Sequence, residues 1–551
     1  MSQTTRVSDA ADVLTLNLSG TSWNGPPLFS VSVGGARVGG EHACNAGFYQ
    51  QLSEDLTLTG RWGPGPHEVV VTFLNDAGDP TADRNLWVNH ALYNGTLTRV
   101  RAGLTATGDK ATFAVASPTR VLDPGFQMLG VNLAGAEFGG SLGEAYAANP
   151  SVGVFGTDYT FPTPAQIDHY AGQKLNVVRL PFMWERLQPA RDGPLDAAYA
   201  ARIDDVVAHA GAKGVRVILD VHNYGYGYGR LVGSAETPTA SFADFWSRVA
   251  ARHAAAPHVV FGLMNEPNKQ TPAQWLPSAN AAIAAIRAAG AAQLILVPGT
   301  HYTNGASWIT GGNAADFAER VVDPGANFAF EIHQYNDADH SGKNPAPVFE
   351  GIGVDRLVDV TWWAERTGRK LFLGEFGAGK QPASLAAMER QLAFARAHSN
   401  VWLGGTIWAG GPWWPADYPF LTEPVDGVAS PQVQALRRFL PLAAPGPATT
   451  PETVRKTAAA VNIGVRVVAS LGTLGAAEER GASVSAPAIG YTANAAAAGD
   501  ATIPVRLDIH TPRYIGPVPT LTYSRAGETA AAAQLRAAMV AQGLAVDNTT
   551  A

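Results

Sequence analysis

The sequence predicts a multidomain protein: an N-terminal β-sandwich, a central (β/α)8 TIM barrel and a C-terminal region of unknown fold. At 551 residues the chain is too long for one ordinary hydrophobic core. Near residue 122, short strands separated by turns give way to apolar runs that alternate with helical stretches. A Pro-, Thr- and Ala-rich segment follows at 442–453. We therefore expect domains at 1–118 and 122–441, a linker at 442–453 and a region of unknown role at 454–551.

The sandwich is predicted from short alternating segments. "LFSVSVGGARVGG" and "HEVVVTFLNDAGDP" place apolar residues at every second position and are bounded by Gly, Asn, Asp and Pro. Alternation of this kind is typical of strands with one face on a core. No helical period interrupts residues 1–118, which favours two packed sheets.

The barrel is predicted from eight apolar runs with helical patterns between several of them, an order typical of βα units. A doubly wound sheet is the alternative, but "GVNLAGAEFGG" matches its Gly-rich phosphate loop poorly. The eight runs are 126–135, 176–182, 216–222, 259–267, 294–299, 328–335, 370–377 and 404–411.

The bulk composition excludes several functions. A net charge of −7 with only 15% charged residues offers no basic surface for nucleic acid and no polybasic membrane patch. No apolar run is long enough to span a bilayer. One cysteine, Cys44, permits no internal disulfide and is expected to be a small packed residue. No classical signal peptide is visible at the N-terminus.

Polar and aromatic side chains follow the ends of six of the eight runs, and the C-terminal ends of barrel strands form the active face. Two of them, Glu266 and Glu375, lie on runs four and seven, on opposite sides of the barrel mouth. Paired carboxylates suit glycosidic bond cleavage, with a separation near 5 Å for retaining and about 6.5–9.5 Å for inverting enzymes. The remaining side chains at these ends are Arg179, His222, Asn223, Asn265, His333, Tyr335 and Trp408.

Together these residues resemble glycoside hydrolase family 5. The resemblance rests on Asn-Glu-Pro at 265–267, His-Gln-Tyr at 333–335 and Gly-Glu-Phe at 374–376, and covers about 122–435. "GVNLAGAEFG" and "FLGEFGAG" are similar to the cellulase branch. The resemblance implies that Glu266 is the acid/base and Glu375 the nucleophile.

It also implies the roles of the neighbouring residues. Arg179 would keep Glu375 ionised, Tyr335 would orient it, and His333 would sit beside Glu266. Asn265 would bind the sugar 2-hydroxyl and His222 would contact the sugar at the cleavage site, with Asn223 next to it. Rings near the strand ends are expected to form a groove for several sugars, with Trp408 stacked on the sugar face and further platforms at Trp184, Tyr224, Tyr226, Tyr228, Trp413 and Trp414.

The N-terminal part is similar to the calcium-dependent carbohydrate-binding modules of families 36 and 60, which favour xylan. The resemblance rests on "FLNDAGDPTADRNLWVNHALYNG" at 73–95. Asp76, Asp79 and Asp83 cluster on one turn, and calcium prefers several carboxylate and carbonyl oxygens. We expect Ca²⁺ in this module and no cofactor for catalysis.

The sequence therefore predicts a retaining endo-β-1,4-glucanase whose partner is a β-glucan polysaccharide. The same chemistry on mannan, glucomannan, xyloglucan or xylan is one alternative, because fold does not fix substrate. A non-catalytic polysaccharide-binding protein is another. Transglycosylation in place of hydrolysis and the oligomeric state stay open, and we expect the protein to act outside the cell.

Overall fold

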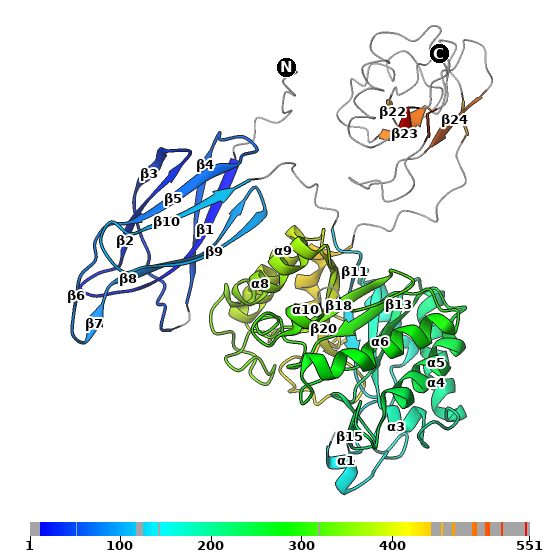
Figure 1. Ribbon diagram of the computed structural model, residues 1–551. Helices are drawn as coiled ribbons and strands as arrows, with labels where there is room; N and C mark the ends of the chain where they lie inside the picture. Colours follow the sequence, from blue (N-terminus) through cyan, green and yellow to red (C-terminus); the bar gives the residue numbers. More distant parts are fainter. Residues whose placement is uncertain are drawn as a thin grey trace. The chain divides into compact units, whose positions relative to one another are not determined.

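The computed structural model describes residues 12–50, 52–116, 125–141, 144–317 and 320–441, together with short strands beyond 442. The chain divides into two compact units, 1–442 and 443–551 (Figure 1). The first unit contains the N-terminal sheets and the barrel. In the part of the chain that is described, no helix has the length and apolarity needed to cross a bilayer.

The N-terminal strands form two four-stranded antiparallel sheets, in the orders β4-β1-β8-β9 and β10-β5-β2-β3. Alternating side chains of β2 and β5 are buried, because inward-facing residues come at every second position. Cys44 is buried among them, and burial raises the pKa of its thiol to about 12. The predicted sandwich is confirmed, with strands β1 Asp12–Thr21, β2 Leu28–Val33, β3 Ala36–Ala43, β4 Glu54–Gly60, β5 His67–Phe73, β6 Gly78–Asp79, β7 Ala82–Asp83, β8 Asn85–Tyr93, β9 Thr96–Leu104 and β10 Lys110–Val115.

Eight parallel strands close the barrel in chain order, which confirms the predicted (β/α)8 fold. Each expected run contains or overlaps one strand. The strands are β11 Met128–Leu133, β12 Val177–Phe182, β13 Arg216–Val221, β16 Val259–Gly262, β17 Ile295–Pro298, β18 Phe328–His333, β19 Leu371–Phe376 and β20 Trp402–Gly410; a small hairpin joins β14 Tyr226–Gly227 to β15 Arg230–Leu231.

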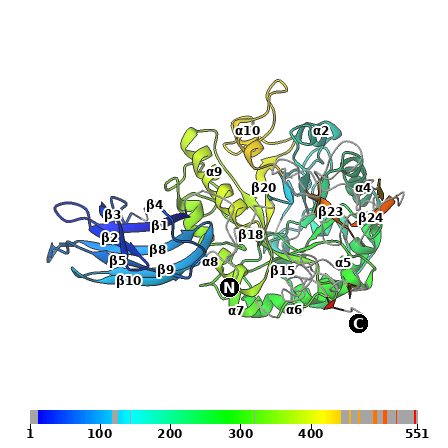
Figure 2. The ribbon, with the colours of Figure 1, turned by 90° about the horizontal axis from the view of Figure 1, so that it is seen from above.

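Helices surround the barrel strands (Figure 2). Both α2 and α6 begin with a capping box and a proline at the first positions, Thr163-Pro164 with Gln166 and Thr271-Pro272 with Gln274. The helices are α1 Glu144–Ala148, α2 Pro164–Gly172, α3 Trp184–Leu187, α4 Ala197–Ala212, α5 Thr239–His253, α6 Pro272–Ala288, α7 Asn313–Phe317, α8 Ile352–Thr367, α9 Pro382–Ala397 and α10 Pro431–Leu436, followed by the 3-10 turn η1 Arg437–Phe439.

The barrel interior is apolar near the strand starts and charged further along. One buried apolar residue from each strand forms a separate cluster there: Met128, Val177, Ile218, Val260, Leu296, Ala329, Phe372 and Leu403. Two residues later on three of these strands, and so on the same strand face, come Arg179, Asp220 and Glu331. All three are fully buried. The fold therefore places a charged layer under the active face.

In the second unit, β21 Thr453–Arg455, β22 Arg466–Val468, β23 Ala488–Thr492 and β24 Thr502–Arg506 form a sheet, and β25 Thr520–Leu521 pairs with β26 Val546–Asp547. The segment 501–516 is β-like in sequence and contains β24. The segment 528–546 is helical in sequence pattern and lies almost wholly outside the described residues.

Candidate active site

Arg179 lies at the centre of the site. Its side chain is fully buried, with Nη1 donating to Glu375 Oε1 at 3.0 Å and Nη2 donating to Asn265 Oδ1 at 2.9 Å. Two further ion pairs reach Glu331 Oε1 from Nε at 2.9 Å and Asp220 Oδ1 from Nη2 at 3.1 Å. A buried charge is tolerated only when it is paired in this way. Nη1 also donates to Asn132 Oδ1 at 3.0 Å, so the planar guanidinium holds three carboxylates and two amides in fixed directions.

Glu375 is ionised by its neighbours. Tyr335 Oη donates to Glu375 Oε2 at 2.8 Å, while Arg179 holds the other oxygen. Burial alone would raise the pKa of Glu375, but the charges of His333 and Arg179 outweigh it and lower the pKa below the ordinary value. A charged carboxylate at neutral pH is what a nucleophile requires.

The surroundings of Glu266, in contrast, favour its protonated form. It follows β16 with φ of 42°, an uncommon conformation for a residue with a side chain, and its side chain keeps 17% of its surface exposed. Burial raises the pKa of Glu266, and the charge of Glu375 adds to this, while the hydrogen bond to His333 opposes it. Carboxylates whose environments push their pKa values apart are the usual acid and nucleophile pair.

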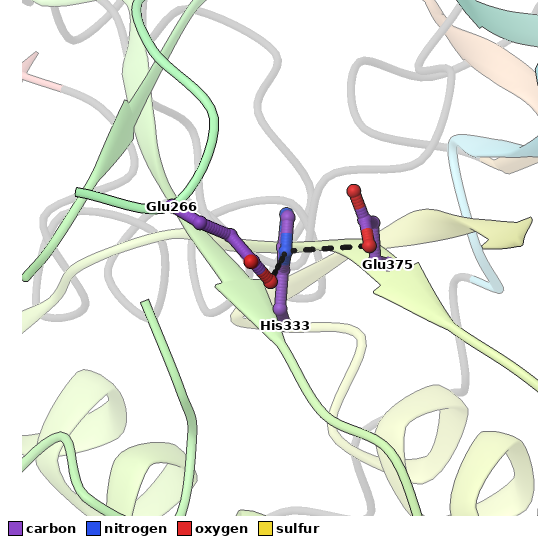
Figure 3. A group of neighbouring side chains, drawn as sticks. All are labelled: Glu266, His333 and Glu375. Carbon is purple, nitrogen blue, oxygen red and sulfur yellow. Dashed lines mark hydrogen bonds and ion pairs between the residues drawn. The ribbon is translucent and has the colours of Figure 1, made fainter. Parts of the chain in front are cut away.

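His333 lies between the two carboxylates (Figure 3). Its Nδ1 is 2.8 Å from Glu266 Oε1 and 3.7 Å from Glu375 Oε2. One oxygen of each carboxylate and a ring nitrogen of His333 all lie within 4.8 Å of one another. Such a group is compact enough for a metal ion, but the acids raise the pKa of His333 to about 10 against the effect of burial. A protonated imidazole donates a hydrogen bond from each ring nitrogen.

His222 lies on the other side of Asn265. Its Nδ1 is 2.7 Å from Asp220 Oδ2, and its Nε2 faces Asn265 Nδ2 and Tyr224 Oη, each at 3.3 Å. The ring of Trp408 stacks against His222 at 5.7 Å between centroids. The structure thus brings His222, Asn265, Tyr224 and Trp408 together beside the carboxylates, and their contacts with a sugar stay a prediction.

Two aromatic rings, Tyr418 and Trp414, extend this side of the site beyond Trp408. Trp408 Nε1 donates to Tyr418 Oη at 3.0 Å, and Trp414 stacks on Tyr418 with centroids 4.1 Å apart. Trp413 is 40% exposed. The sequence predicted Trp408, Trp413 and Trp414 as platforms but missed Tyr418, which has no motif to mark it.

Two predicted substrate contacts need correction. Trp184 is fully buried and packs on Phe242 and Phe245, because it opens helix α3 immediately after β12 and turns toward the helix layer. It has no surface on which a sugar can stack. Asn223 is also buried, and both ends of its amide are used, by the backbone N–H of Trp184 and by Glu185.

Among the tyrosines of "HNYGYGYG", Tyr226 and Tyr228 are also packing residues and not sugar platforms. Tyr226 is buried, and Tyr228 Oη donates to the Gln188 backbone oxygen while its ring packs edge-on to Trp184. These two rings support the loop after β13, whereas Tyr224 alone faces the site through His222.

Sequence reasoning missed Asp220 and Glu331. Each stands two residues before an active-site histidine, in "DVH" and "EIH", and points to the same strand face. That spacing was a usable signal, since an acid on the face of a barrel strand that carries a site histidine has to be paired inside the barrel.

The predicted calcium ligands are only partly assembled. Asp79 and Asp83 lie on the hairpin β6–β7, both exposed, but the three carboxylates do not gather as one group in the described part of the chain. Asp79 Oδ1 accepts from the Thr81 and Ala82 amides, and its Oδ2 accepts from Trp23 Nε1 at 3.1 Å. These bonds lower the pKa of Asp79, the largest effect coming from Thr81, and leave a charged hard-oxygen donor. Asp76, Asp79 and Asp83 as the ligand set therefore stay a prediction.

The barrel carries two carboxylates whose pKa values are shifted in opposite directions. An arginine and a tyrosine contact one of them, and stacked rings lie beside them. Together these features define a glycoside hydrolase. Residues 131–411 match the family model "Cellulase (glycosyl hydrolase family 5)", and the chain belongs to that family. Residues 13–105 match the model of a Ca-dependent, xylan-binding carbohydrate-binding module, family 60. The resemblance noted from the sequence is confirmed for both parts.

Known relatives align with the barrel. Endo-beta-1,4-glucanase B of Emericella nidulans is 37% identical over 317 residues, covering 57% of this chain and 92% of that protein. Among solved structures, an endo-beta-1,4-glucanase of Xanthomonas axonopodis pv. citri is 39% identical, with TM-score 0.54, covering 57% of this chain and 98% of the other. Endoglucanase Cel5A of Pseudomonas stutzeri in complex with cellobiose is 32% identical, with TM-score 0.52, covering 58% and 95%.

Proposed function

We propose that the protein is a retaining endo-β-1,4-glucanase in which Glu375 is the nucleophile and Glu266 the acid/base. One observation carries the proposal: two carboxylates on either side of His333, with oxygens within 4.8 Å and pKa values moved in opposite directions. This spacing supports double displacement, because inverting enzymes need about 6.5–9.5 Å to admit a water molecule.

In the first half-reaction, a Glu375 oxygen attacks the anomeric carbon as the bond to the leaving oxygen breaks. Glu266 gives its proton to that oxygen, and a glycosyl ester forms on Glu375. In the second, Glu266 takes a proton from water, the water oxygen attacks the same carbon, and Glu375 leaves as a carboxylate. Two inversions return the original configuration.

The surrounding residues support binding of a sugar chain. Asn265 is fixed by Arg179, and we expect it to contact the 2-hydroxyl, where hydrogen bonds strengthen in the transition state. His222 and Trp408 form one wall of the cleavage site. Trp413 and the stacked pair Trp414–Tyr418 offer ring faces further along, which suits cleavage inside a polymer.

The relatives support cellulose as the polymer, since those compared are named endo-beta-1,4-glucanases or endoglucanases. The xylan-binding description of the module favours a second candidate, the same chemistry on xylan or on mannan, glucomannan or xyloglucan. A non-catalytic polysaccharide-binding protein is disfavoured because Glu266, Glu375 and their partners are all in place. A polymeric substrate also fits our expectation of action outside the cell.

Product analysis tests the proposal. Wild type and Glu266→Ala are incubated with soluble carboxymethylcellulose, mixed-linkage β-glucan, glucomannan and xylan. We expect rapid viscosity loss and short cello-oligosaccharides on the first two with wild type alone. Cleavage confined to mannan-type polymers or xylan would keep the mechanism and change the substrate. No cleavage of any polymer would overturn the enzymatic proposal.

A further inference from the structure

Glu331 is a fully buried carboxylate in the middle of β18 that the two-step reaction does not use directly. Its Oε1 lies 2.9 Å from Arg179 Nε and 3.3 Å from His333 Nε2. Its pKa is lowered although burial opposes this, because Arg179 and His333 favour the charged form. Glu331 is therefore a fixed negative charge on the side of His333 that faces away from Glu266.

The contacts form a closed ring of charges. Glu266 meets His333 Nδ1, His333 Nε2 meets Glu331, Glu331 meets Arg179, and Arg179 meets Glu375. Glu375 closes the ring at 3.7 Å from His333 Nδ1. The titratable and charged groups around His333 are thus Glu266, Glu331, Glu375 and Arg179. Tyr335 lies one contact further out, on Glu375, and His222 reaches Arg179 through Asn265.

We propose that Glu331 is a positioning residue that keeps His333 protonated on both ring nitrogens throughout the reaction, so that the imidazolium serves as a fixed cation between the two catalytic carboxylates. The proposal rests on the roles assigned above to Glu266 and Glu375. It assigns no proton transfer to Glu331 itself.

The movement of negative charge during the reaction explains why a fixed cation helps. Before the first step, the negative charge is on Glu375 and Glu266 carries a proton. In the glycosyl ester, Glu375 is neutral and Glu266 is the anion. The charge has moved from one side of His333 to the other, and the imidazolium contacts both positions. A preorganised charge of this kind stabilises both states without rearrangement.

A neutral His333 would not do this. Without a second acid on Nε2, the ring would face only Glu266 and Glu375, whose charges both change during each turnover. Glu331 supplies an anion that does not change, and Arg179 holds it in place. The neighbouring pair Asp220–His222 has the same spacing and also contacts Arg179, yet it lies away from Glu266. It offers a matched comparison.

The charge of His333 is measurable in the intact protein by selective ¹⁵N-histidine labelling, with the signal among 13 histidines assigned through His333→Asn. In wild type we expect His333 to be doubly protonated at pH 8, where an unperturbed histidine is neutral. A neutral His333 ring in wild type at pH 8 would overturn the proposal. This measurement needs no Glu331 variant, so it decides the question even if such a variant fails to fold.

Glu331→Gln removes the charge and keeps the shape. We expect its His333 signal to titrate at a lower pH than in wild type. The ratio of its kcat to that of wild type on a soluble aryl cellobioside should fall about tenfold as the pH rises, with the same midpoint. Asp220→Asn, which removes another acid from Arg179, should leave the His333 signal unchanged. A ratio that is flat with pH would make Glu331 merely structural and contradict the proposal.

These results separate the two proposals. Activity retained by Glu266→Ala and Glu375→Ala would overturn the proposed function itself. Inactive Glu266→Ala and Glu375→Ala together with a neutral His333 in wild type would overturn only the role of Glu331.

Discussion

The α-carbon of Gly374 lies against the carboxyl group of Glu331. A methyl group at position 374 would meet Glu331 Cγ at 2.7 Å and Cδ at 2.8 Å, closer than atoms can pack. Glycine in the Gly-Glu-Phe motif therefore makes room for the charged layer beneath the nucleophile.

Gly374→Ala is expected to lower kcat by about tenfold or more, because the displaced Glu331 disturbs Arg179 and His333, and misplacement of about 1 Å is costly in a preorganised site. Gly172→Ala is the matched control. It lies in helix α2, where a Cβ meets nothing within 4 Å. It should leave kcat unchanged and stabilise the fold by about 0.5–1 kcal/mol. Equal kcat values for Gly374→Ala and wild type would contradict this account of the glycine.

Two tryptophans at strand ends should behave differently. Trp184→Ala removes a fully buried ring and is expected to destabilise the protein by about 3–5 kcal/mol, seen as a lower Tm. Trp408→Ala is expected to raise KM on cello-oligosaccharides, because its ring forms a wall of the site beside His222, with a smaller change in Tm. Thermal unfolding and steady-state kinetics on both variants check this, and the reverse pattern would contradict it.

The pH profile of kcat/KM is set by two carboxyl groups whose ordinary pKa is 4.5. Glu375 must be ionised and its pKa is lowered, so activity is expected to disappear on the acid side only below pH 4.5. Glu266 must be protonated and its pKa is raised, so the alkaline limb is expected above pH 4.5. Rates on a soluble aryl cellobioside between about pH 3 and 9 test this. An alkaline limb below pH 4.5 would contradict a raised pKa for the acid/base.

Calcium should affect binding and not cleavage. We expect EDTA to weaken retention of the full-length chain on insoluble xylan and to leave hydrolysis of short soluble oligosaccharides almost unchanged. Asp79→Ala should reproduce the loss of binding, whereas Glu41→Ala, an exposed acid on β3, should not. Retention that is independent of calcium would remove the metal from the module.

Much of the fold could be read from the sequence because the strands of a barrel are nearly continuous apolar runs. The side chains just beyond them, such as Glu266 and His333, were predictable for the same reason. Trp184 was not, because nothing in "FMWERL" shows that a helix begins at the tryptophan and turns it inward. Glu331 could have been suspected from its place two residues before His333, but its partner Arg179, on another strand, is brought to it only when the barrel closes.

The most direct test of the account is to trap the glycosyl-enzyme. The protein is incubated with an activated 2-deoxy-2-fluoro-β-cellobioside and digested, and the labelled peptide is identified by mass spectrometry. The account predicts one added 2-deoxy-2-fluorocellobiosyl group on the peptide containing Glu375, and no labelling of Glu375→Gln. Label on Glu266, or labelling of Glu375→Gln equal to that of wild type, would contradict it.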